Sequence, residues 1–124
     1  MSCRGIRGAI SVDINEADAI LAATRELLER IVSANDLCVE DLAAVTFTAT
    51  PDLTEAYPAR AARDMGWHHT PLLCMQEMAV NDGVSGCIRV LALWNTDRSP
   101  DQIHHVYLGR ARALRPDLAE EETE

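Results

Sequence analysis

The stretch Cys87-Ile88-Arg89-Val90-Leu91-Ala92-Leu93-Trp94 holds one charged residue in a run that is otherwise apolar. Successive residues of a β-strand point to opposite faces, so both faces of this predicted strand are apolar apart from Arg89. Strands of this kind are usually covered on both faces. An arginine keeps its charge at ordinary pH, and a buried charge without a partner is costly. Arg89 therefore needs an anion, which is either a carboxylate of the protein or a ligand.

Composition restricts the class of protein. The chain has 124 residues, of which 48% are hydrophobic, and this suits one domain with one core. No apolar run approaches the roughly 20 residues of a membrane span, and the N-terminus lacks the apolar core of a signal peptide. The net charge of −9 argues against nucleic acid and against an anionic membrane surface as partners. We therefore expect a cytoplasmic protein that binds neither.

All eleven cationic side chains are arginine. This reflects a genome rich in G and C, a need to bind planar anions through paired hydrogen bonds, or both. A metal site is not indicated. The four cysteines form no C-x-x-C pair, and adjacent residues such as His68-His69 or His104-His105 would point to opposite faces of a strand.

Periodicity predicts the secondary structure. Residues 3–12 alternate as a strand, and residues 16–34 carry the apolar spacing of an amphipathic helix with Asn15 as its N-cap. The other expected elements are strands at 42–49, 69–74 and 87–94, a short helix at 58–65, a turn at 81–86 and renewed order at 101–108.

These elements predict a single α/β (α+β) domain over residues 1–118, with a mixed sheet of about five strands and one long helix. Residues 119–124 form an acidic tail that we expect to be disordered. One long helix covers only one face of a sheet, yet the strand at 87–94 is apolar on both faces. A second subunit would cover the other face, so we expect a homo-oligomer.

Several polar residues are candidates for a site, each with a purely structural alternative. Glu77 lies among Leu, Cys and Met, and either forms a salt bridge with Arg89 or faces a ligand together with it. Arg7 has open space around it because Gly5 and Ala9 flank it. The hydroxyl of Tyr107 either closes a pocket or caps the edge of the core.

Two further arginines are ambiguous. Arg63 lies on a solvated helix face or reaches a site, and Arg115 is a mobile lid residue or a surface charge. No Ser-His-Asp or Cys-His arrangement supplies a nucleophile. The set suits binding a small polyanion and stabilising charge better than acyl or phosphoryl transfer.

Seven short motifs, taken together and in order, resemble the monofunctional α/β-type (AroH-class) chorismate mutases of bacteria. The resemblance covers residues 3–118, and it is carried by Arg4-Gly5-Ile6-Arg7-Gly8-Ala9, Thr50-Pro51-Asp52-Leu53, Tyr57-Pro58-Ala59, Cys74-Met75-Gln76-Glu77-Met78, Cys87-Ile88-Arg89-Val90, His105-Val106-Tyr107-Leu108 and Leu114-Arg115-Pro116-Asp117-Leu118.

This resemblance implies the Claisen rearrangement of chorismate to prephenate, on the route to phenylalanine and tyrosine. It also implies a homotrimer whose sheets form a pseudo-α/β-barrel, with active sites at the subunit interfaces. The reaction is unimolecular, so no metal or cofactor is expected. The enzyme has to hold the chair-like conformer and stabilise the charge that separates as the ether bond breaks.

The resemblance also assigns catalytic roles. Arg89 would point at the ether oxygen, where negative charge develops. Glu77 would accept a hydrogen bond from the ring hydroxyl and balance positive charge on the ring, and Cys74 would also face that hydroxyl. Arg7 and Tyr107 would anchor the side-chain carboxylate.

The remaining implied contacts belong to the pocket wall and rim. Tyr57 and Leu114 would form walls, while Arg63 and Arg115 would screen the ring carboxylate from a mobile rim. Two positions depart from the family pattern: Tyr57 stands where Phe is frequent, and Leu73 where Thr is frequent.

Two other functions fit the same inventory of residues. One is a non-catalytic trimeric protein that binds a small carboxylate. The other is an imine or enamine deaminase-like enzyme, in which Glu77 would serve as the base that activates water. Turnover of chorismate distinguishes all three.

Overall fold

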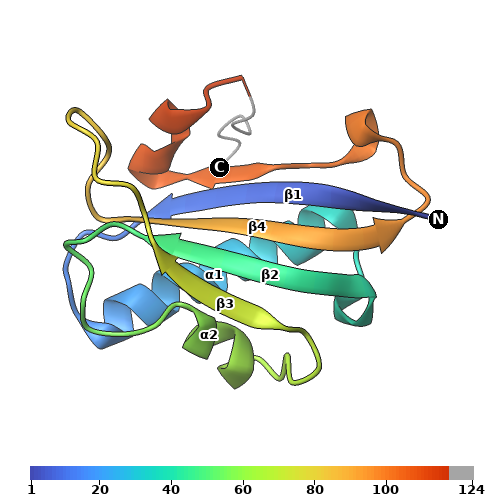
Figure 1. The fold of residues 1–124 in the computed structure, drawn as a ribbon, viewed down its shortest axis with the longest axis horizontal. Helices are drawn as coiled ribbons and strands as arrows, with labels where there is room; N and C mark the ends of the chain where they lie inside the picture. Colours follow the sequence, from blue (N-terminus) through green and yellow to red (C-terminus); the bar gives the residue numbers. More distant parts are fainter. Residues whose placement is uncertain (118–124) are drawn as a thin grey trace.

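The computed structural model describes residues 1–117, which form a β-sheet with helices packed against it (Figure 1). The acidic segment 119–124 lies outside this range. The strands are β1 Ser2–Ser11, β2 Leu42–Ala49, β3 Leu72–Gln76, β4 Cys87–Thr96 and β5 Val106–Leu108. The α-helices are α1 Ala17–Asn35 and α2 Ala59–Asp64, and the 3-10 helices are η1 Val39–Asp41, η2 Pro100–Gln102 and η3 Gly109–Leu114.

Strand β4 lies at the centre of the sheet, whose strand order is β3-β2-β4-β1-β5. It pairs antiparallel with β1 and β2, while the outer strands β3 and β5 pair parallel with β2 and β1. The mixed five-stranded sheet confirms the predicted fold class. The apolar stretch at 87–94 is the central strand of this sheet.

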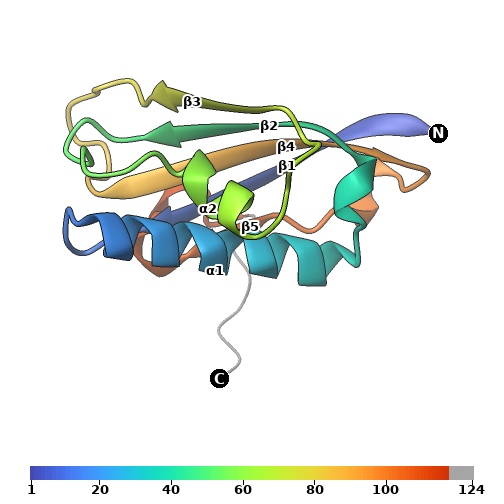
Figure 2. The same ribbon diagram turned by 90° about the horizontal axis from the view of Figure 1, so that it is seen from below.

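Helix α1 covers one face of the sheet (Figure 2). Its buried stripe is the one that the helical spacing predicts: Ile20, Thr24, Leu27, Leu28 and Ile31. At Gly8 of β1, an added Cβ would lie 2.8 Å from the Cδ1 atom of Ile31. The helix therefore approaches the sheet closely because position 8 has no side chain.

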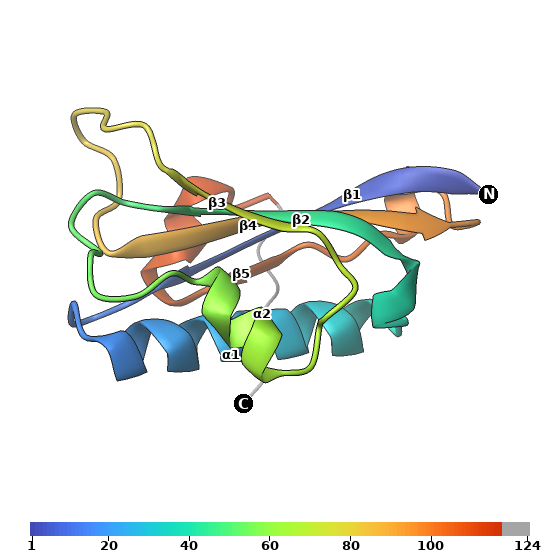
Figure 3. The same ribbon diagram turned by 60° about the horizontal axis from the view of Figure 1, so that its bottom comes forward.

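The opposite face of the sheet is largely open. Figure 3 shows α1 and α2 on one side, while the loop at residues 77–86 rises on the other side at one end. The open face presents large apolar side chains that are 37–56% exposed: Leu73, Met75, Leu91 and Leu93. The single chain therefore covers β4 on one face only, in agreement with the expectation that one long helix covers only one face of the sheet.

Two local predictions need correction. The N-cap of α1 is Glu16, without a side-chain cap bond, because Asn15 instead exchanges two 2.9 Å hydrogen bonds with Thr54. Strand β3 begins later than predicted, because Pro71 has no N–H to donate to a ladder and contributes only its carbonyl, to Val45. None of the helices within residues 1–117 has the length and apolar character to cross a membrane.

Candidate active site

The open face places Arg89 in the middle of a row of side chains that crosses all five strands. Across β2, Thr48 pairs with Arg89 on one side and with Met75 on the other. Across β1, Ala9 pairs with both Arg89 and Tyr107. Because alanine is small, the space between Arg89 and Tyr107 is not filled by the side chain of β1.

Glu77 reaches the same row from the end of β3. Its backbone N–H donates to the carbonyl of Ala49 at 2.9 Å, which fixes the start of the loop. Its carboxylate Oε1 atom accepts a 2.7 Å hydrogen bond from the Thr48 hydroxyl and lies 3.8 Å from the Nε atom of Arg89. The Arg89 side chain is 42% exposed, so the expected burial of this charge is not found in the single chain. This loose ion pair is compatible with both partners expected for Arg89, a carboxylate of the protein and an anionic ligand.

Arginines surround this row and make the hollow above it cationic. The hollow has a volume of about 410 Å³, and its charged or polar lining includes Arg7, Thr48, Glu77, Arg89, Tyr107 and Arg115. A neighbouring hollow of about 330 Å³ shares Glu77 and Arg89, and its lining also includes Leu114. Three guanidinium groups against one carboxylate can attract a small dianion despite the net charge of the chain.

Two polar contacts position the arginines at the rim. The backbone N–H of Arg7 donates to the Nδ1 atom of His105 at 2.9 Å. Burial, together with the charges of Arg7 and Arg115, lowers the pKa of His105, which favours the neutral ring that can accept this bond. Arg115 forms a two-pronged pair with Asp117, with donor–acceptor distances of 3.0 and 2.8 Å.

The other predicted site residues lie elsewhere in the chain. Tyr57, Arg63 and Cys74 line a separate pocket of about 600 Å³ beside the outer strand β3, next to α2. Cys74 pairs with the buried Phe47 and packs against the core on the helix-covered side, whereas Glu77 lies on the open face. A single chain therefore holds two groups of candidate residues that it does not bring together.

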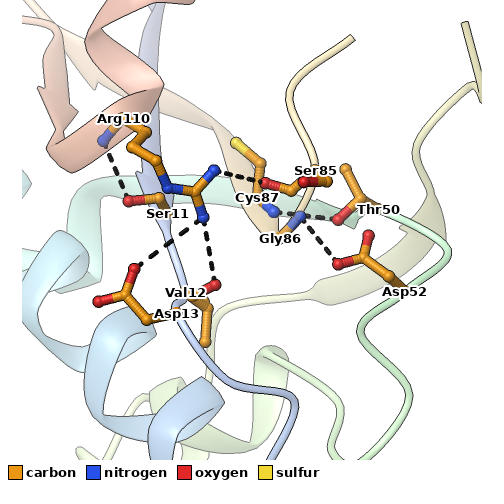
Figure 4. Close-up of polar contacts among 9 residues, drawn as sticks. All are labelled: Ser11, Val12, Asp13, Thr50, Asp52, Ser85, Gly86, Cys87 and Arg110. Atoms are coloured by element: carbon orange, nitrogen blue, oxygen red, sulfur yellow. Dashed lines mark hydrogen bonds and ion pairs between the residues drawn. The ribbon is translucent and has the colours of Figure 1, made fainter. Parts of the chain in front are cut away.

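A polar clasp ties η3 to the ends of β1 and β4 (Figure 4). The guanidinium of Arg110 donates to the carbonyls of Ser85 and Val12 at 3.2 and 3.4 Å and lies 4.0 Å from Asp13. The backbone N–H of Arg110 also donates to the Ser11 hydroxyl at 3.0 Å. The clasp thus links the segment that carries Leu114 and Arg115 to the loop that follows Glu77.

The second half of the clasp holds the start of β4. The Asp52 carboxylate accepts the N–H of Gly86 at 2.9 Å, and the Thr50 hydroxyl accepts the N–H of Cys87 at 3.0 Å. Gly86 has a φ of +56°, and an added Cβ would lie 2.6 Å from the Val12 carbonyl. Burial raises the pKa of Asp52, but hydrogen bonds from Thr50 and Gly86 outweigh it and leave that pKa lowered.

Sequence reasoning missed three contributors to the site. Thr48 gives no signal because threonine is common in strands. His105 enters the sequence analysis only as a metal-ligand candidate and as part of a motif, and Asp52 only as part of a motif. Within residues 1–117, no three His, Cys, Asp or Glu side chains form a group that could hold a metal ion.

Comparison with known proteins gives consistent results. The model of the family described as chorismate mutase type I matches residues 3–118. Chorismate mutase AroH of Thermus thermophilus is 54% identical over 116 residues, covering 93% of this chain and 95% of that protein. Chorismate mutase AroH of Bacillus subtilis (strain 168) is 46% identical over 120 residues, covering 96% and 94%. The solved structure of chorismate mutase from Clostridium thermocellum Cth-682 matches with a TM-score of 0.87 and 44% identity, covering 89% of this chain and 98% of that one.

Proposed function

The chain belongs to the type I family of chorismate mutases, and from this premise we propose how its residues catalyse the rearrangement of chorismate to prephenate. The enzyme is an isomerase of aromatic amino acid biosynthesis. The family match supports this function over a carboxylate-binding protein or a deaminase-like enzyme. It also covers the proposed catalytic domain, residues 1–118, almost completely.

The chemistry requires positioning and charge stabilisation rather than a reactive group. The ether C–O bond of the dianionic substrate breaks while a new C–C bond forms within the same molecule. Negative charge develops on the departing oxygen and positive charge on the ring. A fixed cation near the oxygen lowers the barrier because it interacts more strongly with the transition state than with the ground state.

Arg89 supplies that cation in our proposal. Its position at the centre of the sheet supports this role, since strands on both sides fix its backbone. Its guanidinium is partly exposed to the hollow and only loosely paired with Glu77. Arg7 and Tyr107, which line the same hollow, would bind the side-chain carboxylate and so favour the compact conformer.

Glu77 balances the charge at the other end of the breaking bond. Its Oε1 atom is engaged by Thr48, which leaves its second carboxylate oxygen to accept a hydrogen bond from the ring hydroxyl. Leu114 would then close the adjacent hollow as an apolar wall. When the substrate binds in this arrangement, the Arg115 guanidinium leaves the Asp117 carboxylate and binds the substrate instead.

The separation of the candidate residues into two groups is the observation that carries the remainder of the proposal. Tyr57, Arg63 and Cys74 line one pocket, while Arg89 and Glu77 line another. If each active site combines one group from one subunit with the other group from its neighbour, all of these residues serve a single substrate. We propose that the enzyme is a homotrimer with three such composite sites.

The open face of the sheet supports this assembly. Its exposed apolar side chains, Leu73, Met75, Leu91 and Leu93, form a patch beside the cationic hollow. Packing three such faces together would bury the patch and build the core of a pseudo-α/β-barrel. The four free cysteines fit a reducing compartment, and we place the enzyme in the cytoplasm.

Incubation of the purified protein with chorismate in EDTA, without added metal or cofactor, tests this function. Loss of the ultraviolet absorbance of chorismate, with acid conversion of the product to phenylpyruvate, is the expected result. A heat-denatured sample and a chorismate blank correct for the uncatalysed reaction. If a folded trimer shows no turnover above the blank, the assignment is wrong.

A further inference from the structure

We propose that Thr48 is a positioning residue that holds the Glu77 carboxylate away from Arg89 and so keeps the Arg89 guanidinium available for substrate. The proposal rests on the catalytic roles of Arg89 and Glu77 given above. It goes beyond them because those roles give Thr48 no contact with the breaking bond or the ring, and in this proposal Thr48 acts only through its neighbour Glu77.

The geometry around the Oε1 atom of Glu77 motivates the proposal. This oxygen accepts the Thr48 hydroxyl at 2.7 Å, a short hydrogen bond to a charged acceptor. The same oxygen lies 3.8 Å from the Arg89 Nε atom, beyond hydrogen-bonding distance. The carboxylate thus has a direct bond to the neutral hydroxyl and a longer contact to the cation, although the cation attracts it more strongly.

The register of the sheet explains how a threonine can do this. Thr48 lies directly opposite Arg89 on β2, and β2 separates β4 from β3, the strand that leads into Glu77 (Figure 1). The backbone bond from Glu77 to Ala49 fixes where the carboxylate side chain starts. The Thr48 hydroxyl is therefore the nearer partner of the Glu77 carboxylate, and the Arg89 guanidinium is the more distant one.

Without the hydroxyl, the ion pair should close. Opposite charges about 4 Å apart near a protein surface attract by several times the thermal energy, and both groups here keep partial exposure. A direct pair would occupy donors of Arg89 that the substrate needs. Substrate binding would then have to break the pair, which weakens binding without changing the step that follows.

Two substitutions at position 48 test the hydroxyl separately from the shape of the side chain. Thr48→Val keeps the branched shape that suits a strand and should leave the melting temperature near that of the parent. We expect it to raise KM by about tenfold, the scale of a lost bond to a charged group, with kcat within about threefold. Thr48→Ser, the matched control that keeps the hydroxyl, should restore KM to within about twofold.

The Glu77→Gln background tests whether Thr48 acts through the carboxylate. A neutral amide has no charge to close onto Arg89, so adding Thr48→Val there should change affinity by less than about twofold. Affinity for prephenate, measured by calorimetry, provides the readout in both backgrounds because it needs no turnover. A crystal structure of unliganded Thr48→Val should show a carboxylate oxygen of Glu77 within about 3.2 Å of the Arg89 guanidinium.

Three results would overturn the inference: an unchanged KM in Thr48→Val, a Thr48→Ser variant as impaired as Thr48→Val, or an equal loss of affinity in the Glu77→Gln background. Failure of the proposed function looks different. If Glu77→Gln alone keeps the parent kcat, the role of Glu77 fails whatever Thr48 does. If Glu77→Gln lowers kcat but Thr48→Val is silent, only the positioning role fails.

Discussion

The Nε atom of Arg89 lies 3.8 Å from the Oε1 atom of Glu77, so the two charges at the centre of the open face attract each other without a direct hydrogen bond. A closed pair would neutralise the cation that the reaction needs, whereas a distant pair would not orient it. The observed separation suits a guanidinium and a carboxylate that stabilise opposite charges on one small molecule.

Removing the guanidinium should slow the chemical step. We expect Arg89→Ala to lower kcat by at least about 10²-fold, the usual scale for loss of a preorganised donor to developing charge. Arg89→Lys should recover only part of the rate, because an ammonium is a point charge without the planar fork. Steady-state kinetics with chorismate provide the measurement.

Arg25→Ala is the matched control for this prediction. Arg25 is an exposed arginine on α1 whose partner is Glu29, on the far side of the sheet from the hollow. Its loss should leave kcat and KM at the parent values. A folded Arg89→Ala enzyme with near-parent kcat would contradict the role of Arg89.

Composite sites make a prediction about mixed subunits. Arg89→Ala damages one group of site residues, and Arg63→Glu places a negative charge in the other. Each variant alone should be nearly inactive, but trimers that contain both should regain activity. About one third of the sites in trimers that contain both variants would have two unaltered halves. Co-expression with two different affinity tags, followed by tandem purification, supplies the mixed trimers.

Dilution provides an independent check of the same assembly. Turnover should be lost at concentrations where gel filtration shows monomers, because a monomer holds only separate halves. Active monomers, or mixed trimers without recovered activity, would show that one chain builds a complete site.

The fold was largely predictable because the sheet is central and its pattern is clear. The apolar run around Arg89 indicated the middle strand, and the spacing of Ile20, Leu27 and Ile31 indicated the buried face of α1. Element ends were less predictable. Asn15 has a good side chain for an N-cap, but Thr54, distant in sequence, uses that side chain instead.

The site was predictable in its residue types but not in its arrangement. Glu77 follows Cys74 by three positions, and in this chain the two lie on different sides of the sheet. The role of Thr48 depends on the register between β2 and β4, which no local pattern specifies. Register is a long-range property, so contacts across it emerge only from the assembled sheet.

The clasp makes a prediction about stability. Gly86 and Gly66 both have positive φ, but an added Cβ meets the Val12 carbonyl at 2.6 Å at position 86 and nothing within 4 Å at position 66. Gly66→Ala should therefore cost about 1–2 kcal/mol of unfolding free energy, from backbone strain alone. Gly86→Ala should cost about 3 kcal/mol or more, since the main chain of Val12 has to move as well. Denaturant unfolding measures the loss of unfolding free energy in each variant. Equal losses would show that the main chain around Val12 moves easily to make room for the added Cβ.

The neutral imidazole of His105 should make stability depend on pH in a defined window. Burial and the charges of Arg7, Arg115 and His104 lower its pKa below the usual 6.5, so the unfolded chain binds its proton more readily than the folded protein does. This contribution to stability is complete above pH 6.5 and is lost as the pH falls through the lowered pKa. His105→Asn keeps an acceptor for the Arg7 N–H but cannot titrate, so the fall in melting temperature on acidification should become shallower. His68→Asn, at an exposed histidine, should keep the parent profile. An unchanged profile in His105→Asn would show that other groups cause the acid sensitivity.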